Sequence, residues 1–207
     1  MGLKNIAVFC GSQTGRDEIY ARKARELARA LARRKLTLIF GGGGIGLMKE
    51  VAEEMMTAGG RVVGVIPRNL LERNLGFSGL SEMIVVNDMH ERKATVVRMA
   101  DGFIALPGGW GTLEEIFEVL TWAQLGYHGH PCAFLNVAGY FKPLLEFMTE
   151  AVNQGFLLPE HLKMFTMSED PEEILHFMEY YRPPLILDPI WSLNPEELPG
   201  AENKERV

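Results

Sequence analysis

The sequence alternates apolar runs with amphipathic stretches, and this alternation constrains the fold more than any other feature. Apolar runs, which predict buried strands, lie at 5–10, 36–40, 61–66, 83–86, 102–106 and 131–136. Helix-period patterns lie near 17–34, 47–58, 89–100, from about 113 onward, and near 142–154 and 171–181. Strands that are apolar throughout are buried on both faces, as in parallel sheets, and strand–helix alternation implies right-handed crossovers. We therefore predict an α/β fold with a doubly wound, Rossmann-like parallel sheet flanked by helices.

The domain organisation follows from where this alternation stops. Residues 1–181 are expected to form one domain, because no internal repeat or linker interrupts them. Residues 67–80, with Pro67 and Gly76, are expected to form a loop. The Pro-rich stretch 182–207 is expected to be an extended tail that is disordered at its end.

Charge and cysteine content limit the partners. The 207 residues carry 21 Lys and Arg against 27 Asp and Glu, a net charge of −6. This excess of acid gives no reason to expect nucleic acid or an anionic membrane surface as a partner. No stretch approaches the roughly 20 apolar residues of a membrane span. Cys10 and Cys132 lie in apolar runs and are expected to be free buried thiols, unless their strands are neighbours, so we expect a cytoplasmic protein.

Three glycine-bearing loops follow predicted strands: "CGSQTG" (10–15), "GGGGIG" (41–46) and "PGGWGT" (107–112). Ligands of doubly wound sheets bind at the carboxyl ends of the strands, where these loops should lie together. Glycine allows backbone N–H groups to approach a ligand closely, and helix N-termini favour anions. The three loops together favour a phosphate-bearing ligand over plain tight turns.

Other phosphate and metal motifs are weaker. "GGGGIG" matches G-x-G-x-x-G, but the next strand ends near Arg68 without the acidic residue that holds the ribose of NAD. The lysine of a Walker motif is missing after these loops. "HGH" (128–130) has no further ligand at metal spacing, so loop histidines are the better interpretation. We expect neither a metal nor an organic cofactor.

"LPGGWGTLEE" (106–115) contains a T-x-x-E capping box, in which Thr112 caps a helix and Glu115 reaches back to its N–H. Glu115 has two possible roles, as part of this cap or as a catalyst. The residues expected to form the core stripe of the helix are Leu113, Ile116, Phe117 and Leu120. Glu115 would then face outward beside Val119 and Trp122, and outward apolar residues indicate a partner surface.

The second polar cluster is "MHERK" (89–93), at the start of a predicted helix. Arg92 shares a helical face with Val96 and Met99. An arginine among apolar neighbours either extends its charged end to water or holds an anion or a carboxylate. The residues alone leave both possibilities open.

These motifs together resemble the LOG (LONELY GUY) family, the cytokinin-activating phosphoribohydrolases, many of which carry the label "lysine decarboxylase-like". The pattern P-G-G-x-G-T-x-x-E is complete from Pro107 to Glu115, and M-H-x-R-K is complete at 89–93. "CGS", "GGGxxGLM" and "TWAQLG" (121–126) also fit, and the resemblance covers about residues 5–180. It implies hydrolysis of the N-glycosidic bond of a purine nucleoside 5′-monophosphate by a homodimer whose sites lie near the subunit interface.

The resemblance also implies roles for individual residues. Arg92 and Glu115 are the expected catalytic pair. The expected substrate contacts are Lys93, Gly109, Trp110, Gly111, Thr112, Leu113, Glu114 and Thr121, with Ser12 and Gly43 in the other glycine loops. Asn74 is a departure, because many members carry a substrate-contacting glutamate there; Asn keeps the hydrogen bonding but not the charge. Whether AMP or an N6-modified nucleotide is preferred stays open.

The expected residues suit this chemistry. Glycosidic cleavage builds positive charge on the ribose, and a carboxylate can either stabilise that charge or activate a water. The glycine loops would hold the 5′-phosphate and so position the sugar. The alternative is a nucleotide-binding module of the same fold without catalysis.

Overall fold

A computed structural model describes residues 2–73 and 75–185 of the chain. Asn74 and residues 186–207 of the predicted tail therefore lie outside the described residues. The predicted division into a domain and a tail stays a prediction.

The described residues form one parallel sheet of seven strands in the order β4-β3-β2-β1-β5-β6-β7. The strands are β1 (Asn5–Phe9), β2 (Thr37–Phe40), β3 (Val62–Pro67), β4 (Glu82–Val86), β5 (Gly102–Ala105), β6 (Cys132–Leu135) and β7 (Phe165–Ser168). The chain builds outward from β1 to β4, then returns to place β5 beside β1 and builds in the other direction. The topological switch point therefore lies between β1 and β5, where Val8 is in register with Ile104.

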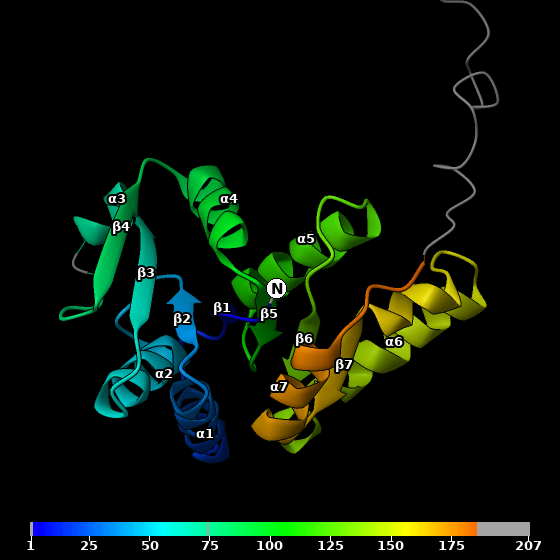
Figure 1. Ribbon diagram of the computed structural model, residues 1–207, viewed down its shortest axis with the longest axis horizontal. Coiled ribbons are helices and arrows are strands. Elements are labelled where there is room, and N and C mark those ends of the chain that lie inside the picture. The colour runs from blue at the N-terminus through cyan, green and yellow to red at the C-terminus, as the bar shows by residue number, and fades with distance from the viewer. Residues whose placement is uncertain (1, 74, 186–207) are drawn as a thin grey trace, which may run out of the picture.

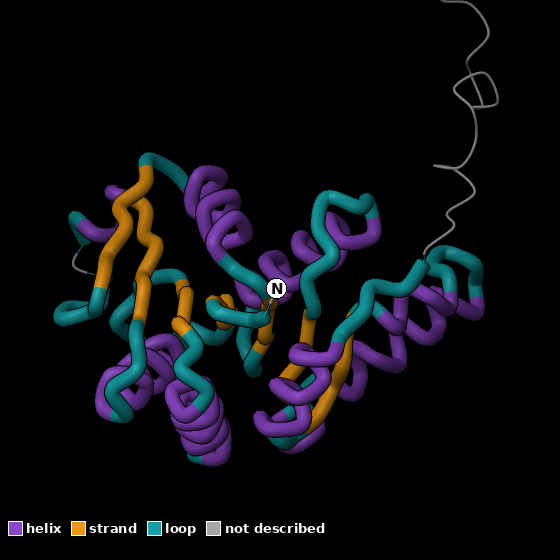
Figure 2. Tube along the Cα trace, viewed as in Figure 1, coloured by secondary structure: helices purple, strands orange, loops and turns teal. Residues whose placement is uncertain are grey.

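Helices cover both faces of this sheet, which confirms the predicted doubly wound fold (Figures 1 and 2). They are α1 (Ile19–Arg33), α2 (Gly46–Thr57), α3 (Arg68–Leu71), α4 (Met89–Met99), α5 (Trp110–Gln124), α6 (Lys142–Asn153) and α7 (Pro171–Tyr180), with short 3₁₀ turns η1 (Val137–Gly139) and η2 (Pro159–Lys163). One hydrophobic core lies under α1, α2 and α7, and a second lies under α4, α5 and α6. The candidate site lies at the carboxyl edge of the sheet, where the loops border both of its faces.

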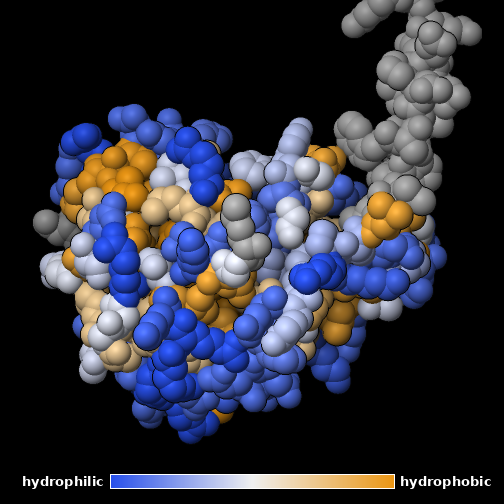
Figure 3. Space-filling model, in the orientation of Figure 1, coloured by the Kyte–Doolittle hydropathy of each residue, from blue (hydrophilic) through white to orange (hydrophobic). Residues whose placement is uncertain are grey.

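The amphipathic pattern of α1 shows how the sequence produces this layer. Ala24, Leu27, Ala28 and Leu31 face the sheet and are fully buried. On the outer side, Arg25 pairs with Glu50 of α2 at 2.5 Å and Arg29 with Glu54 at 2.7 Å. The outer surface of these two helices is accordingly strongly hydrophilic (Figure 3).

Two predictions about the elements were wrong, and one strand was missed. The segment 67–80 is not all loop, because α3 occupies its start. The strand β7 was not predicted, since "FTMS" is short, half polar and mostly only half buried at the edge of the sheet. Helix α5 begins at Trp110 and not near Leu113, and this difference changes the interpretation of Thr112.

The state of the cysteines and the character of the described helices agree with what the sequence predicts. Cys10 and Cys132 are both described, buried and free, because β5 lies between their strands. Among the described helices, none is long and apolar enough to cross a membrane.

Candidate active site

The three glycine loops come together at the carboxyl edge of the sheet, as predicted. The N–H of Gly11 donates to the carbonyl of Pro107 at 3.1 Å, and the N–H of Leu47 donates to the carbonyl of Gly11 at 3.0 Å. Gly46 has a positive φ of 59°, and a Cβ on it would overlap the backbone of Ser12. The loop after β1 therefore joins the other two, and glycine is what permits the close approach.

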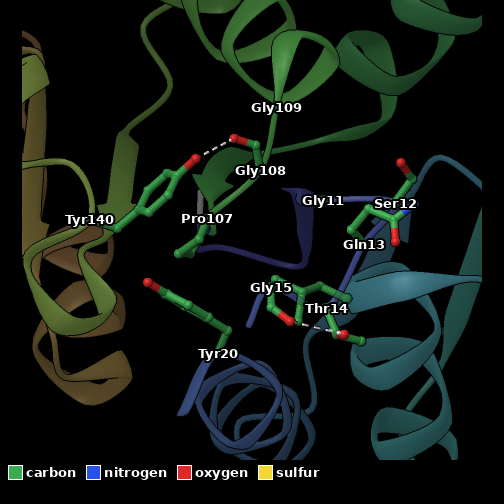
Figure 4. Close-up of a pocket in the computed structure, with 11 residues that line it drawn as sticks. Gly11, Ser12, Gln13, Thr14, Gly15, Tyr20, Pro107, Gly108, Gly109 and Tyr140 are labelled. Carbon is green, nitrogen blue, oxygen red and sulfur yellow. Dashed lines mark hydrogen bonds between the residues drawn. The ribbon is translucent and has the colours of Figure 1, made fainter. Parts of the chain in front are cut away.

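A cavity of about 280 Å³ opens at the switch point between β1 and β5 (Figure 4). It is lined by residues 11–15 and 107–109 together with Tyr20, Leu47 and Tyr140. The predicted contacts Ser12 and Gly109 lie in its wall. The rings of Tyr20 and Tyr140 meet edge to face with centroids 6.1 Å apart, and the Tyr140 hydroxyl donates to the Gly108 carbonyl at 2.7 Å.

These two tyrosines were not predicted as site residues. Tyr20 lies on the apolar stripe of α1 with Ala24 and Leu27, and this helical spacing is typical of core residues. Tyr140 comes from the connection between β6 and α6, and no local pattern links it to a loop 32 residues away.

The start of α5 overturns the predicted capping box. The N-cap is Gly109, which caps without a side chain, and Thr112 lies inside the first turn with only 3 % of its surface exposed. Thr112 packs against Gly108, because a Cβ on Gly108 would overlap the Thr112 side chain. Glu115 is consequently not the last residue of a cap. The first N–H groups of α5 have no intrahelical partner, which leaves them available for an anion.

Arg92 and Glu115 form a largely buried ion pair between α4 and α5. Arg92 Nη2 lies 3.0 Å from Glu115 Oε1, and the two side chains are 13 % and 14 % exposed. This pairing decides between the two possibilities for Arg92 in favour of a carboxylate partner. The guanidinium also lies against Gly41, where a Cβ would overlap it, so the loop after β2 makes room for it. The Arg92 Nε is buried and has no hydrogen-bond partner among the described residues.

The environment of Glu115 raises the pKa of its carboxyl group. Burial raises the pKa of Glu115, and the nearby Glu114 and Glu118 carboxylates raise it further, while Arg92 and Lys93 offset only part of the increase. Glu115 in turn contributes, after burial, to raising the pKa of the Cys10 thiol at the end of β1. The ion pair therefore lies over the carboxyl end of β1.

Lys93 is held by two further carboxylates of α5. Its Nζ lies 2.5 Å from Glu114 Oε1 and 3.1 Å from Glu118 Oε1. The hydrogen bond to Glu114 is the main cause that raises the pKa of Lys93. Glu118 was not predicted; its position four residues after Glu114, on the same helical face, was the available signal.

The site therefore has two parts. Arg92 and Glu115 lie on the face of the sheet covered by α4 and α5, whereas the cavity with Tyr20 lies towards α1. The loop after β1 borders both, because Cys10 lies near Glu115 and Gly11 lines the cavity.

The remaining predicted contacts are more scattered. Trp110 is 90 % exposed at the start of α5, Gly111 has open space around it, and Leu113 is partly buried against the core. Gly43 forms an isolated bridge with Gly76. The Thr121 hydroxyl donates to the Phe117 carbonyl, further along α5.

The described part of the chain contains no group of three or more His, Cys, Asp and Glu residues arranged for a metal ion. The rings of His128 and His130 stack with centroids 5.3 Å apart, and His128 Nε2 lies 2.9 Å from the Val119 carbonyl.

Solved structures share this fold. A molybdenum cofactor binding protein from Rippkaea orientalis aligns with a TM-score of 0.63 and 19% identity over 86% of this chain and 96% of that one. The molybdenum cofactor carrier protein of Chlamydomonas reinhardtii aligns with a TM-score of 0.62 and 20% identity, over 84% and 94%. At these identities the likeness concerns the fold alone.

Other proteins are much more similar to this chain in sequence. The family model described as "possible lysine decarboxylase" matches residues 48–178. Cytokinin riboside 5′-monophosphate phosphoribohydrolase LOG5 of Arabidopsis thaliana is 47% identical over 87% of this chain and 79% of its own length. LOG7 of the same plant is 44% identical over 87% and 83%, and the probable enzyme LOGL2 of Oryza sativa subsp. japonica is 44% identical over 87% and 74%. With its buried Arg92–Glu115 pair and complete motifs, the chain belongs to the LOG family, the family of the cytokinin riboside 5′-monophosphate phosphoribohydrolases.

Proposed function

We propose that this protein hydrolyses the N-glycosidic bond of purine nucleoside 5′-monophosphates and releases the free base and ribose 5-phosphate, with Arg92 and Glu115 as its catalytic pair. The observation that carries the assignment of residues is the buried ion pair beside the glycine loops. The reaction itself is that of the relatives, which share up to 47% of their residues with this chain.

In this proposal the Arg92–Glu115 pair carries out bond cleavage, and the glycine loops bind the phosphate. As the bond between C1′ and the base nitrogen breaks, positive charge develops on the ribose, and the Glu115 carboxylate stabilises that charge. The same carboxylate accepts a proton from the water whose oxygen bonds to C1′. The base leaves with the bonding electron pair and takes up a proton from solvent, and Glu115 releases to solvent the proton that it accepted from the water. Arg92 orients the carboxylate, and its positive charge opposes the increase in the pKa of Glu115 that burial causes.

The glycine loops hold the 5′-phosphate in this proposal. The N–H groups of Gly109, Trp110, Gly111 and Thr112 at the start of α5 suit an anion, and their binding energy positions the sugar. Lys93, Leu113, Glu114 and Thr121, with Ser12, Gly43 and Asn74, remain proposed nucleotide contacts. We expect the exposed Trp110 ring to contact the bound nucleotide.

The description attached to the family model names a different reaction, lysine decarboxylation. That chemistry uses a pyridoxal phosphate Schiff base on a lysine whose pKa is lowered. Lys93, the lysine beside the catalytic pair, is bound to two carboxylates, and its pKa is raised. The environment of Lys93 therefore opposes the decarboxylase role.

We further propose that two copies form a homodimer through the outer faces of α4 and α5. Helix α4 buries only Thr95 and Val96. Met89 of α4 is 41 % exposed. Tyr127 is 75 % exposed and meets Trp122 edge to face. The prediction that Val119 faces outward beside Trp122 was wrong, because Val119 is buried in the core.

The cytoplasmic location stays a prediction.

A paired assay tests the reaction. Release of free base is measured from AMP, from N6-isopentenyl-AMP and from adenosine, with Glu115→Gln as the control for contaminating enzymes. We expect cleavage of at least one nucleotide and far slower cleavage of the nucleoside. Binding of both nucleotides without release of base would instead establish the non-catalytic nucleotide-binding module.

A further inference from the structure

Tyr140 connects the β6–α6 segment to the glycine loop at the start of α5. Its hydroxyl donates to the carbonyl of Gly108 at 2.7 Å (Figure 4). Gly108 immediately precedes Gly109, the N-cap of α5. A side chain from a distant part of the sequence thus holds the peptide at which the proposed phosphate-binding helix begins.

The turn that carries Tyr140 has a rigid and unusual backbone. Ala138 has φ 51° and ψ 34°, and Gly139 has φ 72°, so two successive residues are left-handed. An alanine in this region is strained, and it adopts this conformation only where its surroundings fix it. The Asn136 side chain accepts a hydrogen bond from the Phe141 N–H at 2.7 Å, and the Phe141 ring is 1 % exposed. The backbone of Tyr140 is therefore held between two anchored neighbours.

The hydrogen bond to Gly108 also determines the direction of the next N–H. In a trans peptide the carbonyl of one residue and the N–H of the next lie in one plane and point in opposite directions. Since the Gly108 carbonyl points at Tyr140, the Gly109 N–H points away from it. A Cβ built on Gly109 meets no described atom within 4 Å, so packing on that side does not restrain this peptide. Glycine itself imposes little preference.

We propose that Tyr140 is a positioning residue that orients the Gly109 peptide for the substrate's 5′-phosphate. This role rests on the part of the proposed function in which the site binds the 5′-phosphate of a nucleotide. The edge-to-face contact with Tyr20 supports the Tyr140 ring from the other side of the cavity. Tyr140 acts through the loop and takes no part in bond breaking, so its effect is confined to ligands that carry the phosphate.

The test is Tyr140→Phe, which removes the hydroxyl and keeps the ring. One neutral hydrogen bond corresponds to about a five- to tenfold change in an equilibrium constant. We expect kcat/KM for AMP to fall about five- to tenfold through KM, and the inhibition constant of ribose 5-phosphate to rise by a similar factor. The slow cleavage of adenosine should not change. Tyr180→Phe, at an exposed tyrosine on α7, is the matched control and should alter none of these values.

Three outcomes would overturn the proposal: an unchanged KM and inhibition constant, equal losses on AMP and adenosine, or a fall in kcat alone. Calorimetric titration of the wild type and Tyr140→Phe with ribose 5-phosphate separates this proposal from the proposed function. If the wild type cleaves no nucleotide but binds ribose 5-phosphate more tightly than the variant, the reaction is wrong and the role of Tyr140 stands.

Discussion

Glu115 illustrates how one side chain can be consistent with two roles until its neighbours are known. The T-x-x-E pattern is a real property of the sequence, but α5 starts two residues before Thr112, so the pattern falls inside the helix. What remains is a carboxylate, 14 % exposed, that touches Arg92 and lies near the end of β1. Burial beside a cation is typical of catalytic carboxylates, although structural ion pairs share it.

The first prediction concerns Glu115→Gln. The Gln amide oxygen still accepts a hydrogen bond from Arg92, so the free energy of unfolding should change by only about 1 kcal/mol. The rate should fall by about 10²–10³-fold, because Gln has no charge for the developing cation and cannot act as a base. Single-turnover assays with AMP measure the rate, and urea unfolding measures stability. Glu114→Gln, at a more exposed carboxylate, should lose less activity. Near wild-type turnover by Glu115→Gln would remove Glu115 from the mechanism.

The second prediction follows from the raised pKa of Glu115. Between the unfolded pKa, near 4.5, and the higher folded pKa, the folded protein binds more protons than the unfolded chain at this site. The contribution of Glu115 to the free energy of unfolding is therefore greatest below the unfolded pKa and falls as pH rises through the folded pKa. Glu115→Gln lacks this dependence, so it should gain stability relative to the wild type as pH rises from about 4 to above the folded pKa.

Urea unfolding of both proteins at a series of pH values checks this sign, and AMP hydrolysis should increase over the same pH window as the carboxylate forms. A stability difference that moves in the opposite direction would mean that Arg92 outweighs burial and lowers the pKa of Glu115.

At the scale of elements, the glycine loops depend on close backbone packing at the switch point. A Cβ on Gly108 would overlap the buried Thr112 side chain and lie 2.8 Å from the Gly11 nitrogen, and that backbone has little room to move. We predict that Gly108→Ala lowers the free energy of unfolding by about 2 kcal/mol, as overpacking does.

Gly111→Ala is the matched control for this third prediction. Its Cβ meets no described atom within 4 Å, and alanine is favoured over glycine inside a helix by about 1 kcal/mol. Its stability should be equal to or higher than that of the wild type in the same urea titration. Equal stabilities for Gly108→Ala and the wild type would show that the loops are not closely packed there.

The elements also show what periodicity predicts and where it fails. The apolar strands and the stripe of α1 are determined locally, so six of the seven strands and the parallel class of the sheet followed from pattern, whereas β7 was missed and the order of strands in the sheet was not predicted. The start of helix α5 did not follow from pattern, because its glycines gave no helical signal. Val119 was expected to face outward on a helical wheel, although it is buried in the second core. Arg92 and Glu115 were identified by family resemblance, while their contact, the Lys93 network and Tyr140 depend on tertiary proximity that no local pattern contains.

At the scale of the whole molecule, the two faces of the sheet differ in how completely they are covered. Helix α1 buries six residues and is tied to α2 by ion pairs, so its side of the sheet is closed. Helix α4 buries two, and the outer side of the α4–α5 layer carries partly exposed apolar and aromatic side chains. A second copy of the chain packed there would cover them, and the Arg92–Glu115 pair lies between the same two helices.

The last prediction tests this interface through Trp122→Glu. A carboxylate at the centre of an apolar interface would be desolvated without a partner, which costs several kcal/mol, so the dimer should dissociate. Light scattering at micromolar concentration should give the mass of two chains for the wild type and of one chain for the variant, and hydrolysis of AMP should fall with it. Tyr180→Glu places the same charge on an exposed aromatic of α7, on the opposite face of the sheet, and should keep the mass of two chains. A wild-type monomer would refute the homodimer, and a dimeric Trp122→Glu with full activity would place the interface elsewhere.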